Sequence, residues 1–267
     1  RLTGTWGDLS TQSFYPPHHI TMGEGGAVNI SEDLKLKWPL ESMRDWGRDC
    51  WCPSGEDNTC GKRFAWEFEE LPHGYDHKYV YSHIGYNLKP LDIQAAIGRE
   101  QLKRLPSFIK KRRENWNFLR RELNELGEYF NFMMPTHAIE RSQKTDLFEW
   151  DGTGCRTECS WFGFMLLVKP QSGFTAQKFG KALSENNIGN RSLFGGNLTR
   201  QPAFRDLKNE SPDSFRQIGD LKGADDLMRN AIFLGTYPGL SESNLSMMVE
   251  EVFRFIKGLA LKKHYLG

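Results

Sequence analysis

The sequence has no long apolar run and no block of like charge. No stretch approaches the roughly 18 apolar residues that cross a bilayer, and the first residues lack the charged-then-apolar layout of a signal peptide. The 35 Lys and Arg residues nearly balance the 34 Asp and Glu residues. The most basic stretch, 103–121, is interleaved with apolar residues at helical spacing, which favours a solvated helix face. We therefore expect a cytoplasmic globular protein with no nucleic-acid or membrane partner.

An initiator methionine is also lacking. The chain opens at Arg1 and runs at once into a dense motif of Gly, Ser and His, which is typical of the middle of a domain. We therefore expect an N-terminally truncated sequence.

Periodicity predicts an α/β protein with a boundary between residues 105 and 106. The first part should contain a strand at 11–15, a Gly-rich loop, a strand at 27–30, and helices at 32–45 and 91–105. Between these helices, 47–77 predicts an irregular, ligand-bearing loop. A second helix should begin at Pro106, because proline suits a first turn. Beyond it we expect a strand at 161–169, a helix at 175–186, a strand at 191–194, a helix at 244–261 and an exposed insertion at 139–158.

Four short motifs follow one another along the chain. The first runs from Ser13 through His18 and His19 to Gly23-Glu24-Gly25-Gly26. The others are Gly85-Tyr86-Asn87 before Asp92-Ile93-Gln94-Ala95-Ala96, then Gln201-Pro202-Ala203-Phe204, then Tyr237-Pro238-Gly239-Leu240. Together they resemble the DegT/DnrJ/EryC1/StrS sugar aminotransferase family, whose first motif is close to S-F-x-P-x-K-N-x-T-x-G-E-G-G.

This resemblance implies the α/β fold of PLP-dependent transferases of fold type I, which is aspartate aminotransferase-like. Residues 1–105, including the cysteine loop 47–77, would be the remainder of the large cofactor-binding domain. Residues 106–267 would be the connecting helix and the small C-terminal domain.

His18 stands where the family has its cofactor-binding lysine. Imidazole cannot form the stable imine that a lysine amine forms with an aldehyde cofactor, so ordinary transamination is not expected. Imidazole titrates near neutral pH and can move a proton, which fits a general base. A loop histidine that merely packs or caps is the alternative, but its position in the motif favours the base, with His19 as second choice.

A histidine at this position resembles the 3-dehydrases of deoxysugar synthesis within the family. The resemblance implies pyridoxamine 5'-phosphate as cofactor and a CDP-4-keto-6-deoxyhexose as substrate, which would lose its 3-hydroxyl after the base removes a benzylic proton. It also implies Ser13 on the cofactor phosphate, and Asn87 on the phosphate of the neighbouring subunit in a homodimer. The pyridine-binding aspartate would lie upstream of Arg1. A strand-end hydroxyl for Ser13 and turn chemistry for Asn87 are the alternatives.

Three of the five cysteines form a C-x-C-x7-C cluster at Cys50, Cys52 and Cys60. Clustered cysteines in a cytosolic chain favour metal or redox chemistry over disulfides. The spacing alone leaves zinc, an iron–sulfur cluster or neither open. Cys155 and Cys159 are expected to be ordinary thiols, with substitution as ligands the minor alternative.

The context of the three cysteines resembles an iron–sulfur branch of the family. It implies a [2Fe–2S] cluster whose fourth cysteine lies upstream of this sequence. By the same resemblance, an NADH-dependent flavin and iron–sulfur reductase supplies the two electrons that convert the elimination product to a 3-deoxy sugar, for the 3,6-dideoxyhexoses of lipopolysaccharide O-antigens. Two other hypotheses remain: a cluster-free sugar 3-dehydratase or aminotransferase, and a non-catalytic zinc-binding fragment.

Two weaker candidates stay outside the predicted site. Asn197 and Arg200 sit beside a family motif, and an arginine fork suits a nucleotide diphosphate. His77 and His83 flank an aromatic run that could line a sugar pocket, although burial in a core is the commoner fate of such residues.

Overall fold

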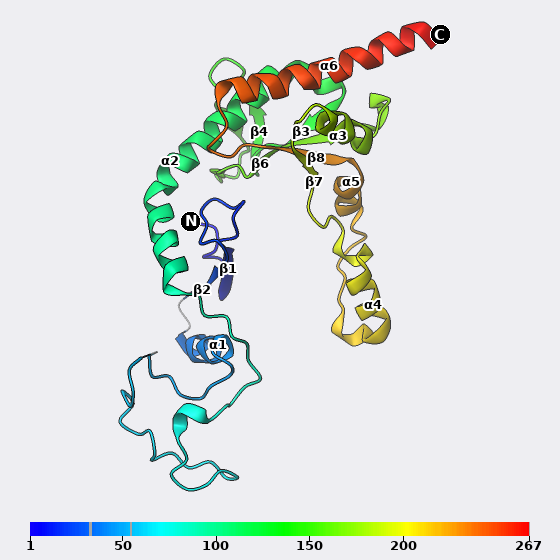
Figure 1. The fold of residues 1–267 in the computed structure, drawn as a ribbon. Coiled ribbons are helices and arrows are strands. Elements are labelled where there is room, and N and C mark those ends of the chain that lie inside the picture. Colours follow the sequence, from blue (N-terminus) through cyan, green and yellow to red (C-terminus); the bar gives the residue numbers. More distant parts are fainter. Residues whose placement is uncertain (32–33, 54, 267) are drawn as a thin grey trace. The chain divides into compact units, whose positions relative to one another are not determined.

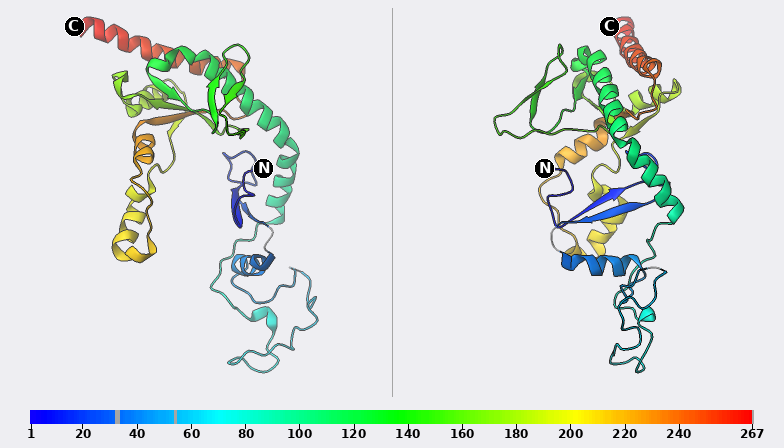
Figure 2. Two further views of the ribbon diagram at one scale, coloured as in Figure 1. Left: turned by 180° about the vertical axis from the view of Figure 1, so that it is seen from behind. Right: turned by 90° about the vertical axis from the view of Figure 1, so that its left-hand side faces the viewer.

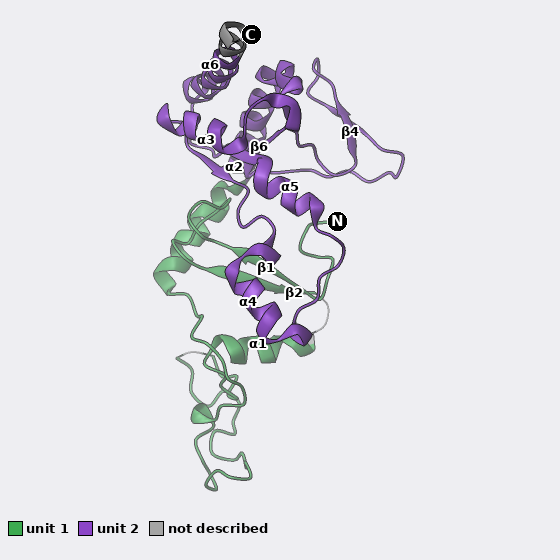
Figure 3. Ribbon diagram, turned by 90° about the vertical axis from the view of Figure 1, so that its right-hand side faces the viewer, with its two compact units in different colours: residues 1–105 green, residues 106–267 purple. Residues whose placement is uncertain are grey.

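The computed structural model describes residues 1–31, 34–53 and 55–266 (Figure 1). Its described residues form two compact units, Arg1–Leu105 and Pro106–Gly267 (Figure 3). The assignment of the first unit to a large cofactor-binding domain, and of the second to a small domain, stays a prediction. Within the described residues, no helix is long and apolar enough to cross a membrane.

The first unit begins with an antiparallel hairpin of β1 (Leu9–Ser13) and β2 (Gly26–Ile30). The expected order of strand, Gly-rich loop and strand is present, although the first strand starts and ends two residues earlier than predicted. Ser13 pairs with Gly26, so the residues between them form one closed loop. The expected helix at 32–45 appears as η1 (Leu34–Leu36) and α1 (Lys37–Arg44), while residues 32 and 33 lie outside the described residues.

The cysteine segment 47–77 has no regular strand or α-helix among its described residues, as its composition predicts. It leads into the short η2 (His77–Tyr79). Val80 is the one buried apolar side chain among the described residues of this unit. This unit therefore depends on polar contacts and half-buried aromatic rings to hold its irregular part together.

α2 (Asp92–Glu122) is one helix with Pro106 inside it. The prediction of two helices divided at Pro106 is therefore wrong. An internal proline costs a helix about 3 kcal/mol through a lost hydrogen bond and a clash. The residues on both sides are mostly good helix formers, and Trp116 and Leu119 of the same helix are buried, which together outweigh that cost.

The second unit is built on a four-stranded antiparallel sheet. Its order is β3 (Phe130–Phe132), β6 (Gly163–Val168), β8 (Ala231–Gly235) and β7 (Asn190–Ser192). The helices are α3 (Ala176–Glu185), α4 (Pro202–Glu210), α5 (Lys222–Asn230) and α6 (Glu242–Leu266). The short 3-10 helices, labelled η, are η3 (Asn124–Glu128), η4 (Pro170–Ser172), η5 (Leu198–Arg200) and η6 (Pro212–Ser214). The strands predicted at 161–169 and 191–194 and the helices predicted at 175–186 and 244–261 are present with shifted ends.

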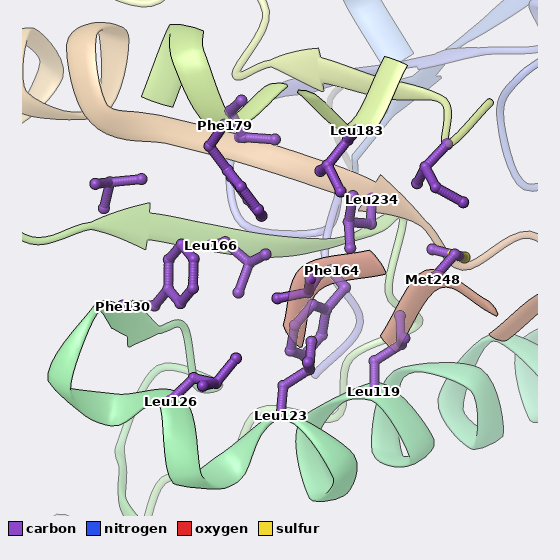
Figure 4. Packing of buried hydrophobic residues seen from close by; sticks show 14 of the residues in the cluster. Leu119, Leu123, Leu126, Phe130, Phe164, Leu166, Phe179, Leu183, Leu234 and Met248 are labelled. Atoms are coloured by element: carbon purple, nitrogen blue, oxygen red, sulfur yellow. The ribbon is translucent and has the colours of Figure 1, made fainter. Parts of the chain in front are cut away.

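The hydrophobic core lies entirely in this second unit among the described residues. β6 alternates, so that Phe164, Leu166 and Val168 are buried on one face of the sheet. Figure 4 shows Phe164 and Leu166 packing with side chains from α2, α3 and α6. The continuous apolar run at 161–169 therefore forms the centre of the core.

Residues 139–158 are only partly an exposed insertion. β4 (Ala138–Arg141) and β5 (Phe148–Trp150) form a hairpin that projects from the rest of the second unit (Figure 2). Arg141 pairs with Phe148 across it, and the Arg141 side chain is 1% exposed while it binds Asp146. Phe148 packs on Trp116 with ring centroids 6.1 Å apart. The exposed insertion that we expected is therefore confirmed for most of the segment, but its two strands were not predicted, because strands this short give too little alternation to recognise.

Candidate active site

His18 lies in the loop between β1 and β2. Its Nδ1 is 3.1 Å from the carbonyl oxygen of Ser13, and its backbone N–H donates to the carbonyl of Tyr15 at 2.9 Å. Because a carbonyl oxygen only accepts, Nδ1 is the protonated nitrogen, and the neutral ring has its lone pair on Nε2. The Tyr15 ring meets the imidazole edge-on, with centroids 5.9 Å apart. Nε2 is therefore the basic atom of the His18 imidazole.

The His18 loop is fixed to the first part of α2. The side-chain amide of Gln94 donates to the carbonyl of Glu24 at 3.1 Å, and its oxygen accepts from the backbone N–H of Leu91 at 2.8 Å. A Cβ placed at Gly98 would lie 2.7 Å from Cγ of Met22, so the helix and loop approach more closely than a side chain allows. Gln94 of the second motif therefore holds the loop of the first motif in place.

Ser13 ends β1 and is exposed. Its Oγ accepts from the backbone N–H of Tyr15 at 3.3 Å, so the Ser13 O–H proton can still be donated elsewhere. A hydroxyl donor suits a phosphate dianion. The loop thus brings together a hydroxyl that can donate a hydrogen bond and an imidazole that can accept a proton.

Asn87 lies in another part of the first unit, in an isolated antiparallel bridge with Asp45. Its side chain is exposed, which suits contact with a second molecule and does not by itself show one. The preceding Gly85 lies at a backbone crossing, where an added Cβ would be 2.3 Å from the backbone nitrogen of Gly47. This close approach accounts for the glycine of the Gly-Tyr-Asn motif.

The thiols of Cys50, Cys52 and Cys60 lie close enough to interact. Hydrogen bonds from Thr59, Cys60 and Cys50 lower the pKa of Cys52 to about 7, with that from Thr59 the largest cause. Burial raises the pKa of Cys50; a hydrogen bond with the Cys52 backbone lowers it, and the thiols of Cys52 and Cys60 raise it. The lowered pKa of Cys52 favours its thiolate, the form that binds metals.

The arrangement of these thiols is not that of a formed metal site. In the described ranges, no group of three or more His, Cys, Asp or Glu side chains has the geometry to hold a metal ion. Cysteine sulfur is a ligand that suits an iron–sulfur cluster or zinc, but the three thiols are not arranged around a common metal position. Cys155 and Cys159 belong to the second unit and are free thiols.

A buried histidine lies near the cysteines, and the sequence pattern signalled it only weakly. His77 is 0% exposed, and its Nε2 lies 2.5 Å from Oδ2 of Asp49, the residue before Cys50. His83 is half-buried and bonds through Nδ1 to the hydroxyl of Ser42 at 2.9 Å. His77 has the buried fate that is commoner for such residues, and both histidines bond within the protein, while a sugar-binding role stays a prediction.

Arg200 is likewise engaged. Its guanidinium binds both carboxylate oxygens of Asp225 at 2.5 Å, and Asn197 donates to the same carboxylate at 2.7 Å. These bonds, that from Arg200 first, hold the pKa of Asp225 well below its ordinary value. Arg200 and Asn197 therefore have a structural role in the second unit, and their suggested role in binding a diphosphate stays a prediction.

Comparison with curated proteins gives close relatives over nearly the whole chain. A lipopolysaccharide biosynthesis protein, RfbH, of Salmonella typhimurium is 44% identical over 255 residues, which are 96% of this chain and 53% of that protein. The dTDP-4-dehydro-2,6-dideoxy-D-glucose 3-dehydratase of Saccharopolyspora spinosa is 42% identical over 96% of this chain and 50% of its own length. The chain thus spans about half the length of the curated relatives it matches.

The fold is also found in solved structures. The E. coli GDP-4-keto-6-deoxy-D-mannose-3-dehydratase with bound hydrated PLP superposes with a TM-score of 0.69 at 23% identity, over 94% of this chain and 56% of that one. The model of the DegT/DnrJ/EryC1/StrS aminotransferase family matches residues 1–253. The expected fold is confirmed, and the chain belongs to the DegT/DnrJ/EryC1/StrS aminotransferase family with the α/β fold of its PLP-dependent members.

Proposed function

We propose that the protein works as a pyridoxamine phosphate-dependent dehydrase that removes the 3-hydroxyl of a CDP-4-keto-6-deoxyhexose in 3,6-dideoxysugar and O-antigen synthesis. The observation that carries this proposal is His18 in the place of the family's lysine, with Nδ1 bonded to the Ser13 carbonyl. A lysine there would favour transamination, whereas an imidazole cannot form the stable imine that this reaction needs and can move protons.

Pyridoxamine phosphate, when bound, would supply the amine that meets the keto group and the ring that accepts electrons. Nε2 of His18 would take the proton from the benzylic carbon and could return it to the departing 3-hydroxyl. The Ser13 O–H would donate to the phosphate, and Asn87 would reach the phosphate in a partner subunit of a homodimer. The Ser13 carbonyl keeps the His18 ring in the tautomer that this role needs.

The names of the relatives support the loss of a 3-hydroxyl more than they support CDP as the nucleotide of the substrate. Besides the dTDP-sugar 3-dehydratase, a GDP-4-keto-6-deoxy-D-mannose 3-dehydratase of Yersinia pseudotuberculosis is 31% identical over 96% of this chain and 56% of its own length. Loss of a 3-hydroxyl is common to both names, while the nucleotide differs. The CDP sugar rests on the resemblance of the cysteine segment alone, and the O-antigen role is supported by the name of the RfbH relative.

We also propose that Cys50, Cys52 and Cys60 are ligands of a [2Fe–2S] cluster that accepts electrons from an NADH-dependent flavin and iron–sulfur reductase. The mutual contacts of the thiols and the lowered pKa of Cys52 support this ligand type. A cluster of this kind needs four protein ligands, so the fourth would come from outside these three cysteines.

A cluster-free 3-dehydratase is the second candidate. It is favoured by the lack, in the part of the chain that the structure describes, of any group arranged to hold a metal ion. In that case the reaction would end without electron transfer, and the three cysteines would be inert.

Anaerobic purification of the chain, followed by iron and sulfide analysis and a visible spectrum, separates the two. About two irons and two sulfides per chain would support the electron-transferring dehydrase. Turnover of the CDP-, GDP- and dTDP-linked 4-keto-6-deoxyhexoses with pyridoxamine phosphate then tests the substrate. A colourless, iron-free protein that eliminates the 3-hydroxyl would favour the cluster-free enzyme, and one that binds no B6 vitamer would sink both.

A further inference from the structure

Two arginine side chains lie close together where the β4–β5 hairpin packs on α2. The ring of Phe148 contacts that of Trp116, with centroids 6.1 Å apart. Arg141 is directly opposite Phe148 across the hairpin, and directly opposite residues have their side chains on the same face. Arg120 follows Trp116 by one helical turn, so it lies on the same face of α2. The guanidinium groups of Arg120 and Arg141 are therefore brought together at this contact.

Neither guanidinium is fully hydrogen-bonded. The Arg141 side chain is 1% exposed, and although its Nη2 donates to Asp146, its Nε–H is buried without an acceptor among the described residues. Arg120 donates through Nη1 to Oδ1 of Asn124 at 2.5 Å, and its Nε–H is also buried without an acceptor in the described part of the chain. A buried donor with no acceptor is costly, and more so on a charged group. Each arginine therefore has a hydrogen bond to donate that these residues do not accept.

Positive charge exceeds negative charge around these two side chains. Arg141 binds one carboxylate, that of Asp146, whereas Arg120 binds a neutral amide. The next residue of α2, Arg121, pairs with its neighbour Glu122 at 3.0 Å between Nε and Oε1. Burial lowers the pKa of Arg120 and the charge of Arg141 lowers it further, while burial also lowers the pKa of Arg141 against the opposing effect of Asp146. An anion between the two guanidinium groups would relieve this repulsion.

We propose that Arg120 and Arg141 bind a phosphate-type oxyanion between the end of α2 and the β4–β5 hairpin. A guanidinium presents its N–H groups in a planar fork that matches the oxygens of a carboxylate or a phosphate. A carboxylate has a single pair of oxygens, whereas the tetrahedral oxygens of phosphate can accept from both forks at once. The anion would take the two Nε–H bonds that the described residues leave unused.

The surroundings of Arg120 suit such a site. The ring centroid of Phe132 is 4.4 Å from the guanidinium carbon of Arg120, a cation–π contact that supports the fork. Arg120 is half-buried and Arg121 is exposed, so an anion can reach the site from the surface. All of these residues belong to the second unit, and none of them takes part in the proposed dehydrase reaction. The site can therefore be tested independently of that reaction.

Thermal melting of the full chain in increasing inorganic phosphate, with ionic strength held constant by sodium chloride, measures this binding. A ligand that binds only the folded chain should raise the melting temperature by about 3 °C for each tenfold increase above its dissociation constant. Arg120→Met and Arg141→Met keep an apolar stem but remove the fork, so each should lose most of this rise. Arg205→Met, at a side chain 63% exposed, is the matched control and should keep it. Ser13→Ala, which changes only the proposed contact with the cofactor phosphate, should keep it as well.

Loss of the rise in both arginine variants, with retention in the two controls, would support the site. Phosphate also stabilises proteins because it is excluded from their surface, and that effect would be equal in all variants. A wild-type rise in either arginine variant would therefore overturn the proposal, as would a wild-type chain that phosphate stabilises no more than sodium chloride does. If Arg141→Met fails to fold, Arg120→Met decides alone. Sodium acetate should give a smaller rise, and an equal one would contradict the choice of a phosphate-type anion.

Discussion

The contact between Gly98 of α2 and Met22 of the His18 loop allows a quantitative prediction. In an isolated helix, Gly→Ala stabilises by about 1 kcal/mol. Here the new Cβ would lie 2.7 Å from Cγ and 3.2 Å from Sδ of Met22. Overpacking of this kind costs about 1–3 kcal/mol. Gly98→Ala should therefore weaken the attachment of the loop although it favours the helix.

Amide hydrogen exchange at Met22, whose N–H donates to the Phe14 carbonyl at 3.0 Å, measures opening of this loop. α2 stays helical whether the loop is closed or open, so the higher helix propensity of alanine affects both states equally. The exchange rate therefore measures only the clash between the new Cβ and Met22. We expect exchange about five- to 150-fold faster, which corresponds to 1–3 kcal/mol. In a Met22→Ala background, Gly98→Ala should have no such effect. Gly258→Ala, where nothing lies within 4 Å of the added atom, is the control. Unchanged or slower exchange in Gly98→Ala would refute the packing of the loop on α2.

Three further outcomes follow from the other contacts. Phe179→Ala, at a fully buried ring, should lower the free energy of unfolding by about 3–5 kcal/mol in urea, against about 0.5 or less for Phe194→Ala at a ring 70% exposed. Asp225 has a depressed pKa, so its bonds with Arg200 and Asn197 stabilise the fold fully above the ordinary value of 3.8, and this stability is lost as pH falls from there towards the lowered pKa; Asp225→Asn should flatten the fall of the melting temperature below about pH 4, and an unchanged slope would contradict this. Thr59→Val should raise the pKa of Cys52, so that alkylation of Cys52 at pH 7, followed by mass spectrometry, slows; an equal rate would show that the Thr59 bond is unimportant.

Sequence patterns predicted what depends on local periodicity. The apolar run of β6, the amphipathic α3 and the Gly-rich loop after β1 all appear in their expected order. The predicted helix boundary at Pro106 was wrong because it depended on the preference of a single residue. The tertiary contacts that keep α2 continuous cannot be recognised from a local pattern. The ordered motifs identified the family and the position of His18, because they depend on residue identity at fixed spacing.

The contacts around the cysteines could not be predicted in the same way. Asp49 and His77 are 28 residues apart in an irregular segment, and no periodicity links them. Gln94 and Glu24, which join two motifs, are 70 residues apart. Such bonds depend on where the chain crosses itself, which local patterns do not determine. The sequence therefore indicated which residues carry reactive or polar side chains, and the structure shows which of these side chains form hydrogen bonds with one another.

The role of His18 is tested by the loss of label from the benzylic carbon of deuterated pyridoxamine phosphate, mixed with the chain and a 4-keto-6-deoxyhexose nucleotide so that the cofactor amine can condense with the keto group. In His18→Asn the amide nitrogen can replace Nδ1 against the Ser13 carbonyl, while the basic Nε2 is lost. We expect exchange to slow by a factor of about 10² to 10⁴ in this variant and to change little in His19→Asn. Exchange at the wild-type rate in His18→Asn, with a large loss in His19→Asn, would contradict it and assign the base to His19.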